Sequence, residues 1–561
     1  MNLNSGRDFK NKIKKRNYIA FVIVILLFIG LLIRLAYVQL TEGPSLAVSA
    51  DKQYYYEEYT DNLTFKLLDS KGESLFDYVT KFYVVVDPMT FYTLNEESSF
   101  VNMRNIMYIL RDYDEDYDIS DLQSEMEKGN KSYEVDENTY NKIKEIKGVK
   151  GIYVYEYKDY DKVINSNIKN ILANPIKVSS NNELKDEGTL ENTIYKYVKN
   201  NKKDKIRFEK DVSKNIISEE FIVNEDNNNV VTTLDKDIQS AVEESLRNEE
   251  DSDFKDYIQI GAVLMESDSG RILSMAQKND WVSNPNIGVT NNSGYLLGST
   301  FKTIVYEAAL ENNLIKEDEV FEIDNIVDGF EESIELQDEY TIREAYIASS
   351  NKAFINIGWQ IGVDKIYEMA KKQGLFNSVL GLQDEAVGRI DGYGSKENVD
   401  IITLTSIGQT ARSTPVGALS IANTVINNGV YVKPRIIETI TKNNGSVVDR
   451  FESEKNIVLS EHTASVLKQS MLGVVNNELG TGKEAKIDGI EVGGKTGTTE
   501  YIDGDKELSD GWFVGFFEYN GKKYSMVVFI PHSGEVQGKS SIACRMFKNI
   551  VENLIDKNLL K

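Results

Sequence analysis

Cysteine and histidine are nearly missing from this sequence of 561 residues. Cys544 is the single cysteine, so no intramolecular disulfide can form, and His462 and His532 are the two histidines. Zinc sites and most other transition-metal sites draw their ligands from these residue types, so we expect no metal and no cofactor of that kind. The sequence also offers little support for a histidine-based catalytic triad, because both histidines fall in patterns typical of structural positions, SEHTASVL and YSMVVFIPHSG.

Basic residues are in deficit as well. The chain has 64 Lys and Arg against 89 Asp and Glu, which gives a formal net charge of -25. Nucleic-acid binding needs a basic face for the phosphates, and no such excess exists beyond the first residues. The sequence therefore excludes nucleic acid as a partner, and we interpret the acidity as a solvated surface.

Long hydrophobic runs are also few, and the one at the N-terminus has the features of a membrane-spanning segment. Residues 17–40, NYIAFVIVILLFIGLLIRLAYVQL, are close to the length that a bilayer requires and follow a short basic tail, residues 1–16. A cleaved signal peptide is the alternative, with AVSA at 47–50 as cleavage site, but the apolar run is longer than a signal core. We expect a transmembrane anchor with a cytoplasmic N-terminus, and the remaining chain outside the cell.

Residues 41–230 contain no nucleophile, metal cluster or phosphate loop that stands out. Alternating runs such as KFYVVVD and KGIYVYEYKDY predict strands, and DENTYNKIKEIK predicts an exposed helix. The polar cluster NEDNNN at 224–229 suits a domain boundary. We interpret this half as a spacer or interaction module.

Residues 231–561 have the pattern of an α+β domain. VVTTLDKDIQSAVEESLRNE predicts a strand and a helix, and DYIQIGAVLMESDSGRILSMAQ predicts two strands joined at 268–270. Helical segments follow at about 340–430, then strands in VGGKTGTTE and GWFVGFFEYNGKKYSMVVFIP, and a last helix that places Cys544 on its apolar side. Strands at both ends of a helical middle predict one sheet that the C-terminus completes.

Three short motifs carry the candidate chemistry. Ser299 and Lys302 lie one turn apart if a helix begins near Ser299, which places a nucleophile beside a possible base. Ser349-Ser350-Asn351 supplies a hydroxyl and an amide in a turn between two helical segments. Lys495-Thr496-Gly497-Thr498 falls on a predicted strand, where the glycine leaves room for a ligand backbone to approach. Each motif alone is more often a helix start, a capping turn or an ordinary strand.

Together and in this order, the motifs resemble those of penicillin-binding proteins and serine β-lactamases. Across about 231–561, and in the membrane segment ending RLAYVQL, the chain resembles a class B penicillin-binding protein, a membrane-anchored peptidoglycan D,D-transpeptidase. The resemblance implies an α+β transpeptidase domain with a central antiparallel sheet, residues 231–561. An elongated α+β pedestal or dimerisation-type domain, residues 41–230, and a single transmembrane helix would precede it.

The resemblance also implies a role for each motif residue. Ser299 would be the acylated nucleophile, Lys302 its general base, Ser349 the proton relay to the leaving amine and Asn351 the amide that positions the donor peptide. Lys495 would help to hold Lys302 unprotonated and attract the substrate carboxylate. The remaining expectations concern binding: Thr496, Gly497 and Thr498 line the substrate site, and the N–H groups of Ser299 and Thr498 form the oxyanion hole.

Expected partners are peptidoglycan stem peptides, β-lactams, the membrane and a polytopic membrane glycosyltransferase, since no glycosyltransferase domain is visible before the pedestal. The chain departs from the family at Leu297, where proline is usual, and at Thr64-Phe65, where the pedestal normally has an Arg-Gly pair. The alternatives are a β-lactam sensor or non-catalytic scaffold, a D,D-carboxypeptidase and a β-lactamase.

Overall fold

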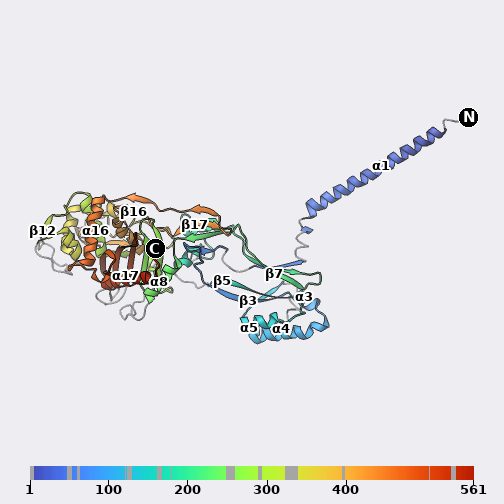
Figure 1. Cartoon of the computed structure of the whole chain (residues 1–561), viewed down its shortest axis with the longest axis horizontal. Helices are drawn as coiled ribbons and strands as arrows, with labels where there is room; N and C mark the ends of the chain where they lie inside the picture. Colours follow the sequence, from blue (N-terminus) through green and yellow to red (C-terminus); the bar gives the residue numbers. More distant parts are fainter. Residues whose placement is uncertain are drawn as a thin grey trace. The chain divides into compact units, whose positions relative to one another are not determined.

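The computed structural model describes most of the chain, and all structural statements below refer to these residues: 5–43, 45–46, 54–59, 64–120, 122, 129–160, 167–177, 180–247, 259–288, 293–322, 339–394, 399–503, 506–531 and 539–560. His532 and the AVSA cluster at 47–50 lie outside them. The predicted anchor forms the helix α1 (Ser5–Tyr37), which continues through the π-helical turn η1 (Val38–Glu42) (Figure 1). This is one helix long and apolar enough to cross a membrane.

The chain divides into two compact units whose segments alternate in the sequence. The first contains residues 1–62, 78–160 and 203–224, and the second contains 63–77, 161–202 and 225–561. One reason for the alternation is a parallel pair of strands, because β2 (Leu67–Leu68) adds to β8 (Asn228–Thr232) in the second unit. The contacts therefore do not follow a single cut at residue 230, and the assignment of residues 41–230 to a pedestal stays a prediction.

The first unit contains two three-stranded sheets. One has the order β4-β3-β5 and the other β1-β6-β7. Alternation along β3 sends Val84 and Val86 into a core with the helices α4 and α5, and Val85 into a second core with Phe208 of β6. The elements are β1 (Tyr55–Tyr59), β3 (Tyr78–Val86), α3 (Pro88–Thr93), α4 (Phe100–Tyr113), β4 (Lys131–Val135), α5 (Glu137–Lys144), β5 (Ile152–Tyr160), β6 (Lys205–Lys210) and β7 (Ile216–Ile222).

An antiparallel sheet of five strands forms the centre of the second unit, in the order β10-β9-β22-β21-β20. The strands are β9 (Gly261–Glu266), β10 (Arg271–Gln277), β20 (Glu491–Asp503), β21 (Lys506–Tyr519) and β22 (Lys522–Ile530). The C-terminal strands extend the sheet from β9 to the edge strand β20, which confirms that the C-terminus completes a sheet begun before the helical middle. The α+β fold class is therefore confirmed.

Helices pack on this sheet from both sides. On one side α8 (Lys236–Arg247) and α17 (Lys539–Asp556) lie against each other and bury Cys544 with Phe513 and Met526 of the strands. This confirms that Cys544 is a small buried core residue. On the other side α15 (Pro415–Ile426) and α16 (Glu461–Asn476) contact β22 and β20. His462 is an exposed residue in the first turn of α16, so its predicted helix start is confirmed.

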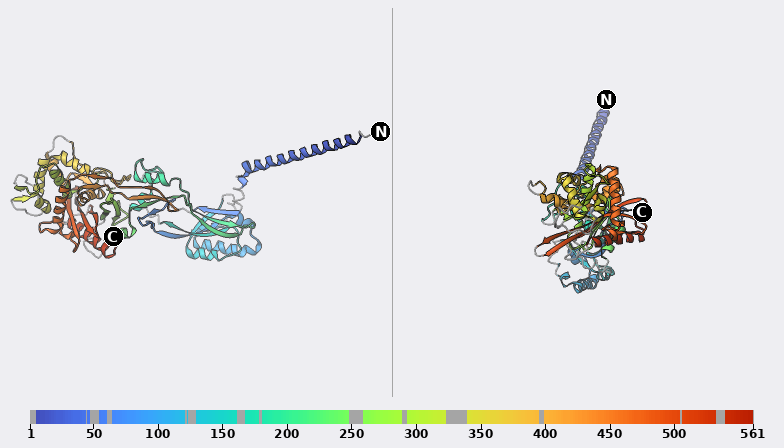
Figure 2. Two further views of the ribbon diagram at one scale, coloured as in Figure 1. Left: turned by 45° about the horizontal axis from the view of Figure 1, so that its top comes forward. Right: turned by 90° about the vertical axis from the view of Figure 1, so that its left-hand side faces the viewer.

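The helical middle of the chain also belongs to the second unit. Figure 2 shows these segments, coloured green-yellow to yellow, gathered against the orange and red C-terminal strands. They comprise the 3-10 turn η6 (Gly298–Phe301) and the helices α10 (Lys302–Glu311), α11 (Ile342–Ala348), α12 (Asn351–Ile361), α13 (Val363–Lys372) and α14 (Val399–Ser406). The remaining α-helices and β-strands are α6 (Ile168–Ala173), α7 (Leu190–Val198), β11 (Tyr295–Leu296), β12 (Val320–Glu322), β13 (Glu339–Thr341), β14 (Arg389–Ile390), β15 (Ala411–Ser413), β16 (Val430–Val432), β17 (Ile437–Lys442), β18 (Val447–Arg450) and β19 (Lys455–Ile457).

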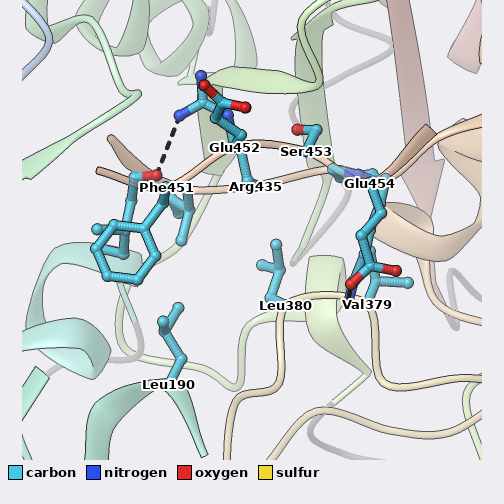
Figure 3. A pocket seen from close by; sticks show the side chains of 12 residues that line it. Leu190, Val379, Leu380, Arg435, Phe451, Glu452, Ser453 and Glu454 are labelled. Atoms are coloured by element: carbon cyan, nitrogen blue, oxygen red, sulfur yellow. Dashed lines mark hydrogen bonds and ion pairs between the residues drawn. The ribbon is translucent and has the colours of Figure 1, made fainter. Parts of the chain in front are cut away.

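A surface cavity of about 150 Å³ lies on the same unit, away from the three motifs. Figure 3 shows it between Leu190 of α7, Leu380 and the segment that carries Phe451 and Ser453. Arg435 borders the cavity, and its guanidinium donates to the carbonyl of Ile437, 3.1 Å away. None of the predicted site residues lines this cavity.

Candidate active site

The first motif lies in a sharp turn between a strand and a helix. The chain leaves β11, passes through η6 and enters α10 at Lys302. Gly298 has a φ of +51°, and a side chain there would place its Cβ 2.5 Å from the carbonyl oxygen of Thr498. The predicted helix start near Ser299 is confirmed, although its first turn is 3-10 in form. Ser299 is partly exposed and Lys302 is fully buried, as a nucleophile and a desolvated amine would be.

Leu297, the residue that departs from the family pattern, has a backbone role of its own. Its side chain is fully buried, and its N–H donates to the carbonyl of Ala411, 2.9 Å away. A proline at this position would have no N–H to donate, so leucine adds one backbone bond between the nucleophile turn and β15. The departure therefore removes no chemical group from the site.

The second motif forms the predicted turn between two helices, α11 and α12. Ser349 ends α11 in the left-handed conformation, with a φ of 60°, and the Ser350 hydroxyl caps α12 by accepting from the N–H of Ala353. This turn directs three acceptors at the Lys302 amine. Lys302 Nζ donates to the Ser349 carbonyl at 2.6 Å and to Asn351 Oδ1 at 2.7 Å, and its distance to Ser349 Oγ is 3.3 Å.

The third motif lies on β20, at the edge of the five-stranded sheet. Lys495 Nζ donates to Ser349 Oγ at 2.9 Å and to the Thr496 carbonyl at 3.2 Å. The two motif lysines therefore meet at one serine hydroxyl. The Thr496 hydroxyl shares a hydrogen bond of 2.6 Å with that of Thr481.

Gly497 also has a structural role within the protein. A Cβ at Gly497 would lie 2.7 Å from Thr300 Cγ2 and 2.8 Å from the carbonyl oxygen of Leu297. The protein's own nucleophile turn thus lies against this face of Gly497, and the expected approach of a ligand backbone stays a prediction. The glycine lets β20 pass close to the turn, which brings Thr498 next to the residues around Ser299.

Burial dominates the electrostatics of the site. Lys495 is 0% exposed, and burial lowers the pKa of its ammonium to about 7. Lys302 Nζ lies 5.7 Å from the centre of the Phe354 ring, and Lys495 Nζ lies 5.6 Å from that of Tyr346. The lowered pKa leaves the Lys495 ammonium able to release its proton near neutral pH.

Three of these neighbours were not predicted as site residues. Thr481 stands in the stretch GTGKEAKI, to which the sequence analysis gave no role. Tyr346 and Phe354 flank the Ser349 motif at ordinary helical spacing, so the sequence alone predicts that their rings are core residues. Their contacts with Lys302 and Lys495 are visible only in the structure.

Comparison with known proteins agrees with this geometry. The family model described as penicillin binding protein transpeptidase domain matches residues 260–552, more than half of the chain. Penicillin-binding protein PbpB of Mycolicibacterium smegmatis is 27% identical over 300 residues, which cover 49% of this chain and 45% of the relative. Stage V sporulation protein D of Bacillus subtilis is 28% identical over 347 residues, with 57% and 52% covered. The chain spans about half the length of these curated relatives.

Solved structures show the same fold over nearly the whole chain. Penicillin-binding protein 3 of Mycobacterium tuberculosis, complexed with aztreonam, has a TM-score of 0.60 at 18% identity and covers 90% of this chain and 98% of its own. Penicillin-binding protein 2B of Streptococcus pneumoniae has a TM-score of 0.59 at 18% identity, with 90% and 100% covered. The chain therefore belongs to the family of proteins with a penicillin-binding protein transpeptidase domain, as its three motifs predict.

Proposed function

We propose that the protein is a peptidoglycan D,D-transpeptidase that acts through an acyl-enzyme on Ser299 and is inhibited by β-lactams. The observation that carries this proposal is the meeting of Lys302 and Lys495 at the Ser349 hydroxyl, with Lys302 one turn after Ser299 along the chain. A nucleophile, a buried amine next to it along the helix and a second hydroxyl that contacts this amine are the groups that an acyl transfer with two proton transfers requires.

In the first half of the reaction, the Ser299 hydroxyl attacks the carbonyl between the two terminal D-alanines of a stem peptide. Lys302 accepts the hydroxyl proton, and a tetrahedral intermediate forms. As the C–N bond breaks, a proton passes from Lys302 to Ser349, whose own proton goes to the leaving D-alanine nitrogen. The 3.3 Å separation of Lys302 Nζ from Ser349 Oγ is suited to this relay.

In the second half, an amine of a neighbouring stem peptide attacks the ester and returns Ser299 to its free form. The amine loses a proton to the same relay, and the relay returns a proton to the Ser299 oxygen as the ester C–O bond breaks, so protons balance over the cycle. A β-lactam opens its ring in the first half, and its leaving amine stays attached, which blocks the second half.

Lys495 contributes charge and orientation. With a pKa of about 7, it is partly protonated at neutral pH, and its charge opposes protonation of Lys302 through the shared Ser349 contact. It also attracts the carboxylate of the substrate, beside Thr496, Gly497 and Thr498 of the same strand. Asn351 holds the donor peptide through its amide.

The oxyanion hole is assigned to the N–H groups of Ser299 and Thr498. The close approach of Gly298 to the Thr498 carbonyl supports this pairing, since it brings both residues to one side of the site. Loss of one such donor costs about 3 kcal/mol of transition-state stabilisation.

The membrane arrangement is part of the proposal. Helix α1 anchors the chain with residues 1–16 in the cytoplasm, and the positive residues of that tail support the orientation. The catalytic domain then faces the cell wall outside. Residues 41–230 serve as a pedestal, and a polytopic membrane glycosyltransferase supplies the glycan strands that this chain cross-links.

The deciding experiment measures turnover with the full chain in detergent, a stem peptide ending in D-Ala-D-Ala and an acceptor amine. We expect free D-alanine and a new amide product in equal amounts. Release of D-alanine without the amide product would favour a D,D-carboxypeptidase. A β-lactam adduct without any D-alanine release would favour a sensor or scaffold, and rapid hydrolysis of the β-lactam would favour a β-lactamase.

A further inference from the structure

Glu307 and Gln373 form an enclosed polar pair among the helices behind the active site. Both residues are 0% exposed. Glu307 lies on α10, five residues after Lys302, and Gln373 follows the last residue of α13. The Gln373 amide nitrogen donates to Glu307 Oε2. The bond therefore connects the helix that begins with Lys302 to the end of its neighbour.

Each member of the pair keeps one buried oxygen, Glu307 Oε1 and Gln373 Oε1, without a hydrogen-bond partner among the described residues. A carboxylate and an amide oxygen can only accept hydrogen bonds, so an ionised Glu307 leaves both oxygens without a donor. A proton on Glu307 supplies that donor. Reversing the amide does not avoid this conclusion, because its oxygen would then face Glu307 Oε2, a contact of two acceptors unless the acid is protonated.

We propose that Glu307 is a neutral acid at physiological pH, joined to Gln373 by two hydrogen bonds, and that this pair is a positioning device for α10. The acid O–H donates to the amide oxygen, and the amide N–H donates to the acid carbonyl. No ion pair reaches Glu307 in the described part of the chain, and an unpaired buried carboxylate is strongly unfavourable. Burial accordingly raises the pKa of Glu307 well above its ordinary value.

The surrounding titratable groups favour the neutral form. Glu311 lies one turn further along α10, and its negative charge raises the pKa of Glu307. Burial raises the pKa of Tyr306 and of Tyr346, so both stay neutral. Tyr346 shares a 2.9 Å hydrogen bond with Thr303 and also lies beside Lys495. A carboxylate at Glu307 would raise the pKa of the site lysines, so a neutral acid preserves their reactivity.

The first test compares the wild type with Glu307→Gln, an isosteric neutral replacement that can keep two bonds to Gln373. Because the acid binds its proton more tightly in the folded state, wild-type stability falls as pH rises above the range of an exposed glutamate, and Glu307→Gln lacks this dependence. The melting temperature of the full chain in detergent should therefore drop relative to that of Glu307→Gln between about pH 5 and pH 8. A constant difference over this range would overturn the proposal.

A second measurement does not depend on a variant being equally stable. The infrared difference spectrum of wild type minus Glu307→Gln at neutral pH should contain the carbonyl stretch of a protonated carboxylic acid. A carboxylate band in its place would show an ionised Glu307. This spectrum is independent of any reaction at Ser299. It therefore tests the protonation of Glu307 separately from the proposed transpeptidase function, and either proposal can be wrong without the other.

The positioning role has its own readout, which rests on the proposed function. Compared with the wild type, Glu307→Ala should lower the rate of the chemical step of penicillin acylation more than it weakens initial binding of penicillin, because α10 loses its attachment to α13. Glu307→Gln should restore most of that step. If Glu307→Ala acylates at the wild-type rate, or if alanine and glutamine variants are equally slow, the pair does not position α10.

Discussion

Lys495 Nζ lies 2.9 Å from the hydroxyl oxygen of Ser349, and Lys302 Nζ lies 3.3 Å from the same oxygen. The chain thus brings two amines from separate motifs to one hydroxyl, although Lys302 and Lys495 are far apart in the sequence. Ser349 can exchange a proton with either amine, and this arrangement gives the proposed mechanism its proton path.

Replacement of Lys302 by alanine should slow acylation of Ser299 by penicillin about 100- to 10,000-fold, the usual contribution of a general base. The measurement is the acylation rate of the full chain at saturating drug. Because Lys302 is fully buried, Lys302→Met serves as the control that fills the same space without an amine. Unchanged acylation in a folded methionine variant would remove Lys302 from the role of base.

Ser349 and Ser350 offer a matched pair of adjacent serines. Ser349→Ala should lower D-alanine release more than initial binding of the stem peptide, because the leaving nitrogen loses its proton donor. Ser350→Ala removes a helix cap and should cost about 1 kcal/mol of stability while turnover stays near normal. Equal loss of turnover in both variants would assign Ser349 a structural role only.

The buried charge of Lys495 should cost stability. Its folded-state pKa, about 7, lies below the ordinary lysine value, so the unfolded chain binds more protons above pH 7 and wild-type stability rises with pH. Lys495→Met should therefore stabilise the protein, by an amount that shrinks by up to about 1.4 kcal/mol per pH unit above pH 7. Thermal unfolding of both proteins from pH 6 to pH 9 measures this, and a pH-independent difference would contradict the depressed pKa.

Substrate binding should weaken as pH rises, whereas the stability contribution of the same lysine increases. The loss of the Lys495 charge as pH rises through about 7 should weaken binding of the stem-peptide carboxylate. Lys495→Met should bind the substrate weakly at every pH. If the two proteins show the same pH profile for substrate binding, Lys495 does not attract the carboxylate.

Gly497→Ala should separate β20 from the nucleophile turn, because its Cβ would lie 2.7 Å from Thr300 Cγ2. We expect acylation to fall by at least about tenfold, since small displacements of aligned groups are costly in catalysis. Gly489→Ala is the control: its φ of +77° disfavours alanine through the backbone alone, because no atom lies within 4 Å of the new Cβ. A similar acylation rate for both variants would show that the close contact is unimportant.

Much of the second unit could be predicted from local patterns. The turn at 268–270, the strands around Lys495 and the Ser349 turn follow from alternation, glycine and capping residues, which act within a few positions. The resemblance of the motifs then placed Ser299, Lys302 and Lys495 in one site, which periodicity alone could not do.

The remainder depends on contacts between distant segments. The pairing of Leu67 with Val230 and the close packing of Thr300 against Gly497 join residues that are distant in the sequence. No local sequence pattern predicts either contact. Glu307 is the clearest case, because a glutamate within a helix is usually exposed to solvent. Its complete burial beside Gln373 emerges only when α10 and α13 are packed together.

The most direct test of the account is the position at which penicillin attaches. The full chain in detergent is incubated with benzylpenicillin, and intact mass and peptide mapping identify the adduct. We expect one stable acyl adduct on the peptide that contains Ser299, and none in Ser299→Ala with an unchanged melting temperature. An adduct on another residue, or an adduct that persists in Ser299→Ala, would contradict the assignment of Ser299 as the nucleophile.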